Sequence, residues 1–110
     1  MEELVKGDVI VLPFPFSDLS SSKKRPAFVA AKLKGDDIIL CQITSALKFD
    51  DYSIDLSNDD FLKGSINLTS MIRPNRLFTA DKSIVLYKLG SLKKVKVKEV
   101  EDSLIKLFKG

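Results

Sequence analysis

The sequence predicts a mainly β protein, a small and partly open β-barrel with one helix packed against it. Three observations lead to this fold class. Runs rich in β-branched and aromatic residues recur about 8 to 12 residues apart, turn-forming residues separate them, and the last segment changes to a helical period. Since 110 residues suffice for one hydrophobic core, we expect a single domain over residues 1–110.

The first half of the chain predicts three strands. Residues 8–14 (DVIVLPF) form the first strand, which leads into a polar, serine-rich and basic loop. Residues 25–33 form the second, with Pro26 near its start or on an edge, where a missing N–H does little harm. A hairpin turn at 34–37 (KGDD) leads to the third strand, 37–44 (DIILCQIT), whose apolar residues fall on both faces and predict burial on both.

The second half predicts further strands. Residues 52–57 alternate as in a half-buried strand, and the DDFLKGS segment after them reads as a turn. Residues 66–75 and 76–79 form either two strands or one bent strand, and Pro74 favours the bend because it has no N–H for the ladder. TADKS is predicted as a turn or short helical cap, and 84–92 as a further strand.

The C-terminal segment has the period of a helix. Apolar residues recur at intervals of three, four, three and one, which places them on one stripe of a helix of about three to four turns. An edge strand over the KVKVK run at 94–98 is the alternative. The stripe consists of Val97, Val100, Leu104, Leu107 and Phe108.

The composition is that of an ordinary globular protein, 45% hydrophobic and 30% charged. The longest apolar run, residues 9–16, is too short to cross a bilayer and holds two prolines, and MEELVKGD shows no signal-peptide pattern. We therefore expect a cytoplasmic protein with no membrane partner. A net charge of +3 and a pI near 9.0 suit a polyanionic partner without demanding one.

The chain has one cysteine and no histidine. Cys41 cannot form an internal disulfide, and its place within IILCQIT predicts an inert buried thiol. A transition-metal site is disfavoured without these ligands, so we expect no metal and no cofactor. Acid–base chemistry must use Asp, Glu, Lys, Tyr, Arg or groups of the substrate.

Positive charge is carried by 15 lysines and only three arginines, Arg25, Arg73 and Arg76. Arginine offers a planar fork of donors that matches two phosphate oxygens, keeps its charge, and is less strongly hydrated than lysine. Arg25 and Arg73 each precede a proline, in KKRPAF and MIRPNR. This chemistry gives a reason to use arginine where lysine would otherwise serve, and Arg76 is expected to have a structural role, such as pairing with a neighbouring carboxylate.

Several segments, in this order and spacing, resemble the PemK/Kid/MazF family of toxin endoribonucleases. They are GDVIVLPFPF with the loop running into KRPAFV, QITS at 42–45, TSMIRPNRLFTADKS at 69–83, and the closing helix. The resemblance covers residues 6–108. It implies an SH3-like, partly open β-barrel of the CcdB/Kid/MazF type, a homodimer with the site near its interface, and a cognate acidic antitoxin peptide as partner.

The resemblance also implies metal-independent cleavage of single-stranded RNA, in which the ribose 2′-OH attacks its own phosphate. Arg25 matches the catalytic arginine of the family and Thr44 its active-site threonine. Arg73 aligns with an arginine that acts in the Kid branch as proton donor and phosphate ligand. Two positions on, that branch has an aspartate as base; here Asn75 stands, and because an amide does not accept a proton at neutral pH, only substrate orientation carries over.

Other residues are predicted to bind the substrate. Hydroxyls and a lysine near the expected site could contact RNA, and phenylalanines could stack on bases, although most of the seven should be core. These residues are Lys24, Ser45, Thr69, Ser70 and, for stacking, Phe14, Phe16 and Phe28, with Phe16 the most exposed by its place at the loop edge.

Two alternatives stay open. The same barrel could bind RNA or protein without cleaving, with the missing aspartate reflecting lost catalysis. A sister branch with this barrel poisons DNA gyrase through a tryptophan near its C-terminus, but this chain has no tryptophan and ends LIKLFKG.

Overall fold

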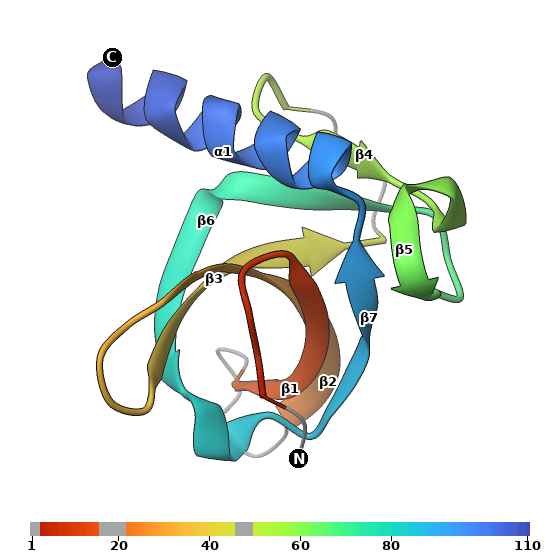
Figure 1. The fold of residues 1–110 in the computed structure, drawn as a ribbon, viewed down its shortest axis with the longest axis vertical. Coiled ribbons are helices and arrows are strands. Elements are labelled where there is room, and N and C mark those ends of the chain that lie inside the picture. The colour runs from red at the N-terminus through yellow and green to blue at the C-terminus, as the bar shows by residue number, and fades with distance from the viewer. Residues whose placement is uncertain (1–2, 16–21, 46–49) are drawn as a thin grey trace.

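A computed structural model describes residues 3–15, 22–45 and 50–110 (Figure 1). One antiparallel sheet of seven strands curls into a half-barrel, in the order β4-β6-β3-β2-β1-β7-β5. The predicted fold class, mainly β with a C-terminal helix, is confirmed. The strands are β1 (Asp8–Pro15), β2 (Ser22–Lys32), β3 (Asp37–Thr44), β4 (Ile54–Leu56), β5 (Phe61–Gly64), β6 (Ser70–Asp81) and β7 (Tyr87–Leu92).

Strand β3 lies between β2 and β6 and is buried on both faces, as its run of apolar residues predicts. Strand β2 is an inner strand of the sheet, but Pro26 itself pairs only with β1. Its missing N–H is tolerated because pairing with β3 begins only at Ala27. Cys41 is fully buried in this region, and burial raises the pKa of its thiol to about 12, as expected for an inert cysteine.

Strand β6 is one bent strand, which confirms the second of the two alternatives. Its pairing with β3 passes from Gln42↔Arg73 directly to Cys41↔Leu77, so residues 74–76 form a bulge that contains the proline. The strand begins at Ser70 and not at residue 66, because the residues before it form a turn in which the Ser70 hydroxyl donates to the carbonyl of Leu68, 2.8 Å away.

The predicted turn at DDFLKGS is wrong, because this segment contains a short 3-10 turn (Asn58–Asp60) followed by β5. Two glycines make the strand possible. A Cβ on Gly64 would lie 2.0 Å from the Leu89 carbonyl oxygen, and a Cβ on Gly90 would lie 2.1 Å from that of Lys63. Only glycine at both positions lets β5 approach β7 so closely.

The start of β7 also differs from the predicted strand at 84–92. Lys82–Ile84 form a second 3-10 turn, capped by the Asp81 carboxylate, which accepts from the Ser83 N–H at 2.8 Å. The predicted short helical cap is therefore confirmed only for its last residues, since Thr79–Asp81 belong to β6, and the next strand begins only at Tyr87.

The C-terminal helix α1 (Lys94–Lys109) lies across β6 and β4 (Figure 1). The helix prediction is confirmed and the edge strand over 94–98 is wrong. Val100 is buried, and Val97 and Leu104 pack beside it. Phe108, the last member of the predicted stripe, is 72% exposed.

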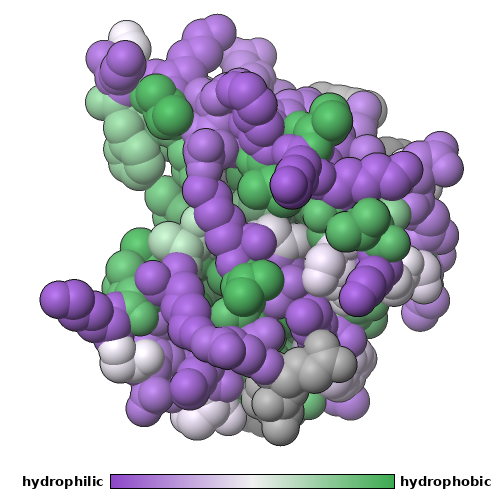
Figure 2. Space-filling view, in the orientation of Figure 1, coloured by the Kyte–Doolittle hydropathy of each residue, from purple (hydrophilic) through white to green (hydrophobic). Residues whose placement is uncertain are grey.

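Apolar side chains gather on both faces of the sheet. One cluster lies beneath α1, β4 and β5 and contains Val9, Phe28, Cys41, Ile43, Leu56, Phe61, Ile72 and Val100. The other lies on the opposite face and contains Leu4, Ile10, Leu12, Ala27, Val29, Ile38, Leu40 and Val85. Outside, hydrophilic side chains cover most of the face in Figure 2, with hydrophobic atoms in separate patches.

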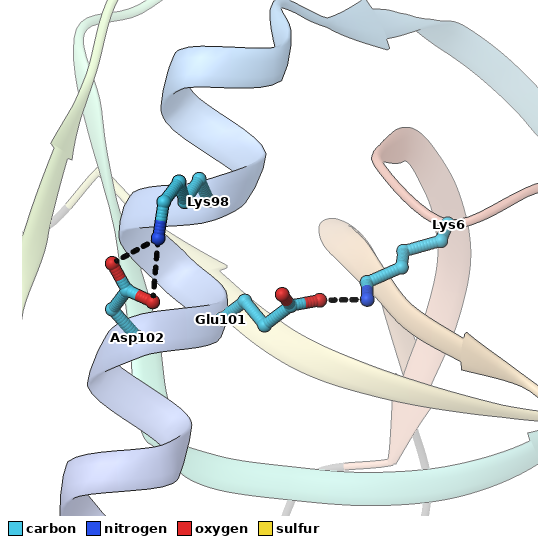
Figure 3. Close-up of polar contacts among 4 residues, drawn as sticks. All are labelled: Lys6, Lys98, Glu101 and Asp102. Carbon is cyan, nitrogen blue, oxygen red and sulfur yellow. Dashed lines mark hydrogen bonds and ion pairs between the residues drawn. The ribbon is translucent and has the colours of Figure 1, made fainter.

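Ion pairs join α1 to its surroundings. Glu101 points from the helix to Lys6, which precedes β1, whereas Asp102 turns along the helix to Lys98, 3.0 Å away (Figure 3). The first pair links the two ends of the chain; the second is a local pair of the i, i+4 kind.

A fully buried carboxylate fixes the start of β1. Asp8 accepts hydrogen bonds from the Val5 N–H and the Ser91 hydroxyl, both at 2.8 Å, and its Oδ2 lies 3.2 Å from Lys88 Nζ. The N-terminal segment, β1 and β7 are thereby joined at one point. No helix in the described part of the chain has the length and apolar character needed to cross a bilayer.

Candidate functional site

The three residues predicted as catalytic lie on one face of three adjacent strands. Ala27 of β2 pairs with Gln42 of β3, which pairs in turn with Arg73 of β6, and directly paired residues point to the same face. Side chains two positions apart on a strand share a face. Arg25 and Thr44 therefore face the same side as Arg73, at the edge of the sheet where β3 ends.

This arrangement brings two guanidinium groups to either side of a threonine. Neighbouring strands lie about 4.8 Å apart, so the backbones of β2 and β6 are about 10 Å apart with β3 between them. Thr44 is buried, and Arg25 and Arg73 are partly buried. The strand order, not closeness in sequence, assembles the set.

Arg73 is held by a carboxylate that sequence reasoning missed. Its Nη2 lies 3.0 Å from Oδ2 of Asp50, and the side chains of the pair are 15% and 28% exposed. Asp50 Oδ1 accepts three further hydrogen bonds, from the N–H groups of Tyr52 (2.9 Å) and Ser53 (2.8 Å) and from the Ser53 hydroxyl (2.8 Å). The Ser53 hydroxyl and the Tyr52 N–H, with Arg73, hold the pKa of this carboxyl well below its usual range.

The bulge of β6 leaves polar atoms without partners. In the described part of the chain, the half-buried Asn75 has a buried Oδ1 with no donor, and Arg73 has a buried Nε–H with no acceptor. Buried polar groups in native proteins are normally satisfied, so an orphaned acceptor and donor two residues apart call for an explanation such as a ligand or an ordered water.

Arg76 follows in the same bulge. It is exposed, and among the described residues it forms no ion pair, so the predicted carboxylate partner is wrong. It borders an apolar groove of about 480 Å³ that continues from the face of Arg73. The groove is lined by Leu12, Pro13, Phe14, Gln42, Arg76, Leu77, Phe78, Thr79, Ala80 and Ile84.

A second groove, of about 280 Å³, lies where β2 extends past the end of β3. Its lining includes the basic and polar residues Lys24, Arg25 and Ser45 as well as Tyr87. Alternation along the strands turns Lys24 away from the face of Thr44, so Arg25 borders both the groove and that face. The remaining lining residues are Val11, Lys23, Pro26, Ile43, Ile66, Asn67, Leu68, Ser70 and Leu89.

The predicted RNA contacts differ in where they lie. Lys24, Ser45 and Ser70 line this groove, but Ser70 is buried and its hydroxyl donates to the Leu68 carbonyl, so its proton serves the turn. Thr69 is exposed beside the groove and is not part of its lining.

The phenylalanines predicted to stack on bases also lie in different environments. Phe28 is core, Phe14 packs edge-on against Phe78 with 5.0 Å between ring centroids, and Phe16 lies outside the described residues. The aromatic ring that the groove presents is Tyr87, 45% exposed, with Lys24 Nζ 5.9 Å from its centroid. Sequence reasoning missed it because it lay within a predicted strand, and no local signal tells which face of that strand is open.

In the described ranges, no three His, Cys, Asp or Glu side chains come together as metal ligands. The polar groups at the site are arginine, hydroxyl and amide groups, together with the Asp50 carboxylate that is paired with Arg73. Arginine, hydroxyl and amide groups bind and orient an anion such as a phosphodiester, and they stabilise charge that develops on its oxygens.

Solved structures share this fold. A MazE–MazF complex from Deinococcus radiodurans is similar at 18% identity with a TM-score of 0.75, over 96% of each chain. MazF from the same organism is similar at 18% identity with a TM-score of 0.72, over 100% of each chain. An endoribonuclease in complex with its cognate antitoxin from a mycobacterial species has 14% identity and a TM-score of 0.74, over 97% of this chain and 96% of that one.

A comparison with curated proteins gives no match. The family model of the PemK-like, MazF-like toxins of type II toxin–antitoxin systems matches residues 5–108, nearly the whole chain. By that match, and in agreement with its half-barrel and closing helix, the chain belongs to the PemK-like, MazF-like toxin family.

Proposed function

We propose that this protein is the toxin of a toxin–antitoxin system and an endoribonuclease that cleaves single-stranded RNA without a metal ion. The observation that carries the proposal is the placement of Arg25, Thr44 and Arg73 on one face of three adjacent strands. Two arginines on either side of a hydroxyl suit a phosphodiester, whose charge rises in the transition state.

In the proposed reaction the 2′ oxygen of a ribose attacks the adjacent phosphorus. A bond forms between the 2′ oxygen and phosphorus, and the bond from phosphorus to the 5′ oxygen breaks, giving a 2′,3′-cyclic phosphate and a 5′-hydroxyl. One proton leaves the 2′ oxygen and one reaches the 5′ oxygen, so no water is consumed. The protein must align the attack and neutralise the non-bridging oxygens.

The residues have distinct parts in this scheme. Arg25 provides positive charge for the phosphate from one side of Thr44. Arg73 orients the phosphate from the other side, and the Thr44 hydroxyl hydrogen-bonds a phosphate oxygen or the 2′-OH. Asn75 has a buried carbonyl oxygen without a donor, which suits a hydrogen bond from the substrate but not proton abstraction.

The second groove is the proposed path of the RNA strand beyond the reacting phosphate. Lys24 and Arg25 supply charge along it, and Tyr87 supplies an exposed ring on which a base can stack. By this proposal, Tyr87→Ala weakens binding of single-stranded RNA about 5- to 100-fold, as loss of one base-stacking contact does. Tyr87→Phe is the matched control that keeps the ring, and equal weakening in both variants contradicts stacking.

We further propose an acidic antitoxin peptide and a second copy of the chain as partners. The relatives include a toxin solved with its cognate antitoxin, and the net charge of +3 suits an acidic peptide. Ile84 and Leu86 are large, exposed and close together in sequence, which suits burial between copies. Sedimentation over a range of protein concentrations tests the dimer, and a mass of one chain throughout contradicts it.

The cleavage proposal is tested with purified protein and a long single-stranded RNA in the presence of EDTA. We expect fragments with cyclic phosphate ends, and a rate at least about 100-fold lower for Arg25→Ala, the scale of losing one transition-state contact. Arg76→Ala is the matched control, an exposed arginine without an ion pair in the described chain, and should cleave as the wild type does.

Two results contradict the proposal. If EDTA abolishes cleavage, the metal-free mechanism is wrong. If RNA is bound with a steep dependence on salt but is never cleaved, the protein is a binding barrel, the alternative favoured by Asn75 at the position of a base.

In cells, overexpression should arrest growth and Arg25→Ala should relieve the arrest.

A further inference from the structure

We propose that Asp50 is a positioning residue for Arg73, which it holds on the reacting face by a fixed ion pair. The inference rests on the proposed function, because it assigns to Asp50 the orientation of a residue that contacts the scissile phosphate. It also identifies a carboxylate beside the site, although position 75, where the Kid branch has an aspartate, holds an asparagine in this chain.

The carboxylate is immobilised by its own turn. Oδ1 accepts from two backbone N–H groups and one hydroxyl, all between 2.8 and 2.9 Å, within the segment from Asp50 to Ser53. Oδ2 is left to accept from Arg73 at 3.0 Å. An acceptor that cannot rotate fixes the donor that binds it, so a long and flexible arginine side chain is held in one orientation.

Asp50 is not suited to be the missing base. Its hydrogen bonds and the guanidinium stabilise the ionised form and hold its pKa well below the usual range. A carboxylate with a lowered pKa takes up a proton less readily than an ordinary one. Its contribution is therefore geometric, and it keeps a constant negative charge at one end of Arg73.

The pair leaves room for a phosphate on the same arginine. A guanidinium has five N–H donors in a planar fork, and the contact with Asp50 uses Nη2. The buried Nε–H of Arg73 also has no acceptor among the described residues, so the protein leaves further donors of this guanidinium unused. Asp50 and substrate can thus bind Arg73 together, which distinguishes a positioning residue from one that blocks the site.

Asp50→Asn separates positioning from a role in the turn alone. The amide oxygen of asparagine can still accept the three hydrogen bonds of the turn, but its NH2 group cannot accept from Arg73. We expect kcat on a single-stranded RNA to fall about 10- to 100-fold, the scale of a small misplacement of a catalytic group, with KM changed less than about threefold. The melting temperature near neutral pH should fall only slightly, because the turn keeps its three hydrogen bonds.

Asp51→Asn is the matched control, since Asp51 is the next residue, is exposed and forms no ion pair among the described residues. It should leave kcat unchanged. A double-mutant cycle with Arg73→Ala adds the decisive comparison: if Asp50 acts through Arg73, Asp50→Asn causes no further loss once Arg73 is absent. An unchanged kcat in Asp50→Asn, or full additivity in the cycle, overturns the proposal.

A second measurement does not depend on cleavage. Hydrogen exchange of the Arg73 side-chain Nε–H, followed by NMR, should be slow in the wild type and at least about tenfold faster in Asp50→Asn, because a released guanidinium samples solvent. Equal exchange in both proteins overturns the clamp. If the wild type fails to cleave RNA while the exchange rates differ as expected, the proposed function fails and the clamp stands.

Discussion

Asp8 and Asp50 have similar hydrogen-bond and ion-pair partners but lie in different surroundings. Each carboxylate accepts from backbone N–H and serine hydroxyl donors, and each pairs with one cation, Lys88 at 3.2 Å and Arg73 at 3.0 Å. Asp8 is fully buried and joins segments far apart in the sequence, whereas Asp50 is partly exposed and most of its donors come from its own turn.

The difference shows what an ion pair contributes in each place. At Asp8 the pair and its donors connect the N-terminal segment to β7, so breaking it leaves buried polar groups unsatisfied. At Asp50 the turn satisfies most of the carboxylate without Arg73, so the ion pair adds little to the fold and acts chiefly on the orientation of the arginine. The first pair should govern stability and the second activity.

The largest effect is expected for Asp8→Ala. It removes the acceptor of the Ser91 hydroxyl and the Val5 N–H together with the carboxylate that faces Lys88, and breaking a buried pair typically costs about 3 to 5 kcal/mol. The partial exposure of Lys88 should bring the loss toward the lower end of this range. Urea unfolding measures it, and Asp55→Ala, an exposed aspartate on β4, is the control with a change below about 0.5 kcal/mol.

Replacing the cation of each pair, Lys88 or Arg73, tests the difference between Asp8 and Asp50 from the other side. Lys88→Met leaves Asp8 buried and unpaired, and we expect a loss of about 2 kcal/mol or more in the free energy of unfolding. Arg73→Met leaves Asp50 with its three turn hydrogen bonds, so stability should fall far less while RNA cleavage falls strongly. Similar stability losses in the two variants would refute the distinction.

A smaller effect should appear in the dependence of stability on pH. The folded-state pKa of Asp50 lies below its unfolded value, so its contribution is fully present above about pH 5 and is lost as pH falls through the unfolded value near 3.9 toward the folded one. Asp50→Asn lacks this contribution. The stability gap between wild type and variant should therefore narrow as pH falls from about 6 to about 3 in urea titrations.

Other carboxylates with lowered pKa, Glu3 and Asp81, are present in both proteins and cancel in this difference. A gap that stays constant across the range would mean that Asp50 titrates alike in the folded and unfolded states.

The smallest effect is expected at the exposed pair on α1. Lys98 and Asp102 are 73% and 57% exposed, and a helical i, i+4 pair of this kind contributes about 0.3 to 0.5 kcal/mol. Lys98→Ala should lower stability by no more than this, and added salt should remove most of the difference. A loss comparable to that of Asp8→Ala would show that exposure is not what ranks these pairs.

Part of the candidate site could be predicted, because the choice of residue type and the order of short motifs along the chain can indicate a chemical role. The scarcity of arginine together with the resemblance to the toxin family indicated Arg25 and Arg73, and that resemblance indicated Thr44; the register brings these three to one face. Asp50 escaped prediction because the chain has many aspartates in polar segments, and nothing local tells which one meets Arg73. Tyr87 escaped because a strand has two faces and its neighbours decide which one is open.

The fold, too, has features that the local sequence predicts and features that depend on tertiary contacts. The sequence by itself determined the strands of the core, the bend at Pro74 and the helical period of the last segment, because backbone preference and hydrophobic spacing act over a few residues. Only the tertiary structure decided that DDFLKGS becomes a strand, since β5 depends on Gly64 meeting Gly90 across the sheet. The tertiary structure likewise decided which carboxylate holds Arg73, because a contact between residues 23 positions apart depends on strand order and register.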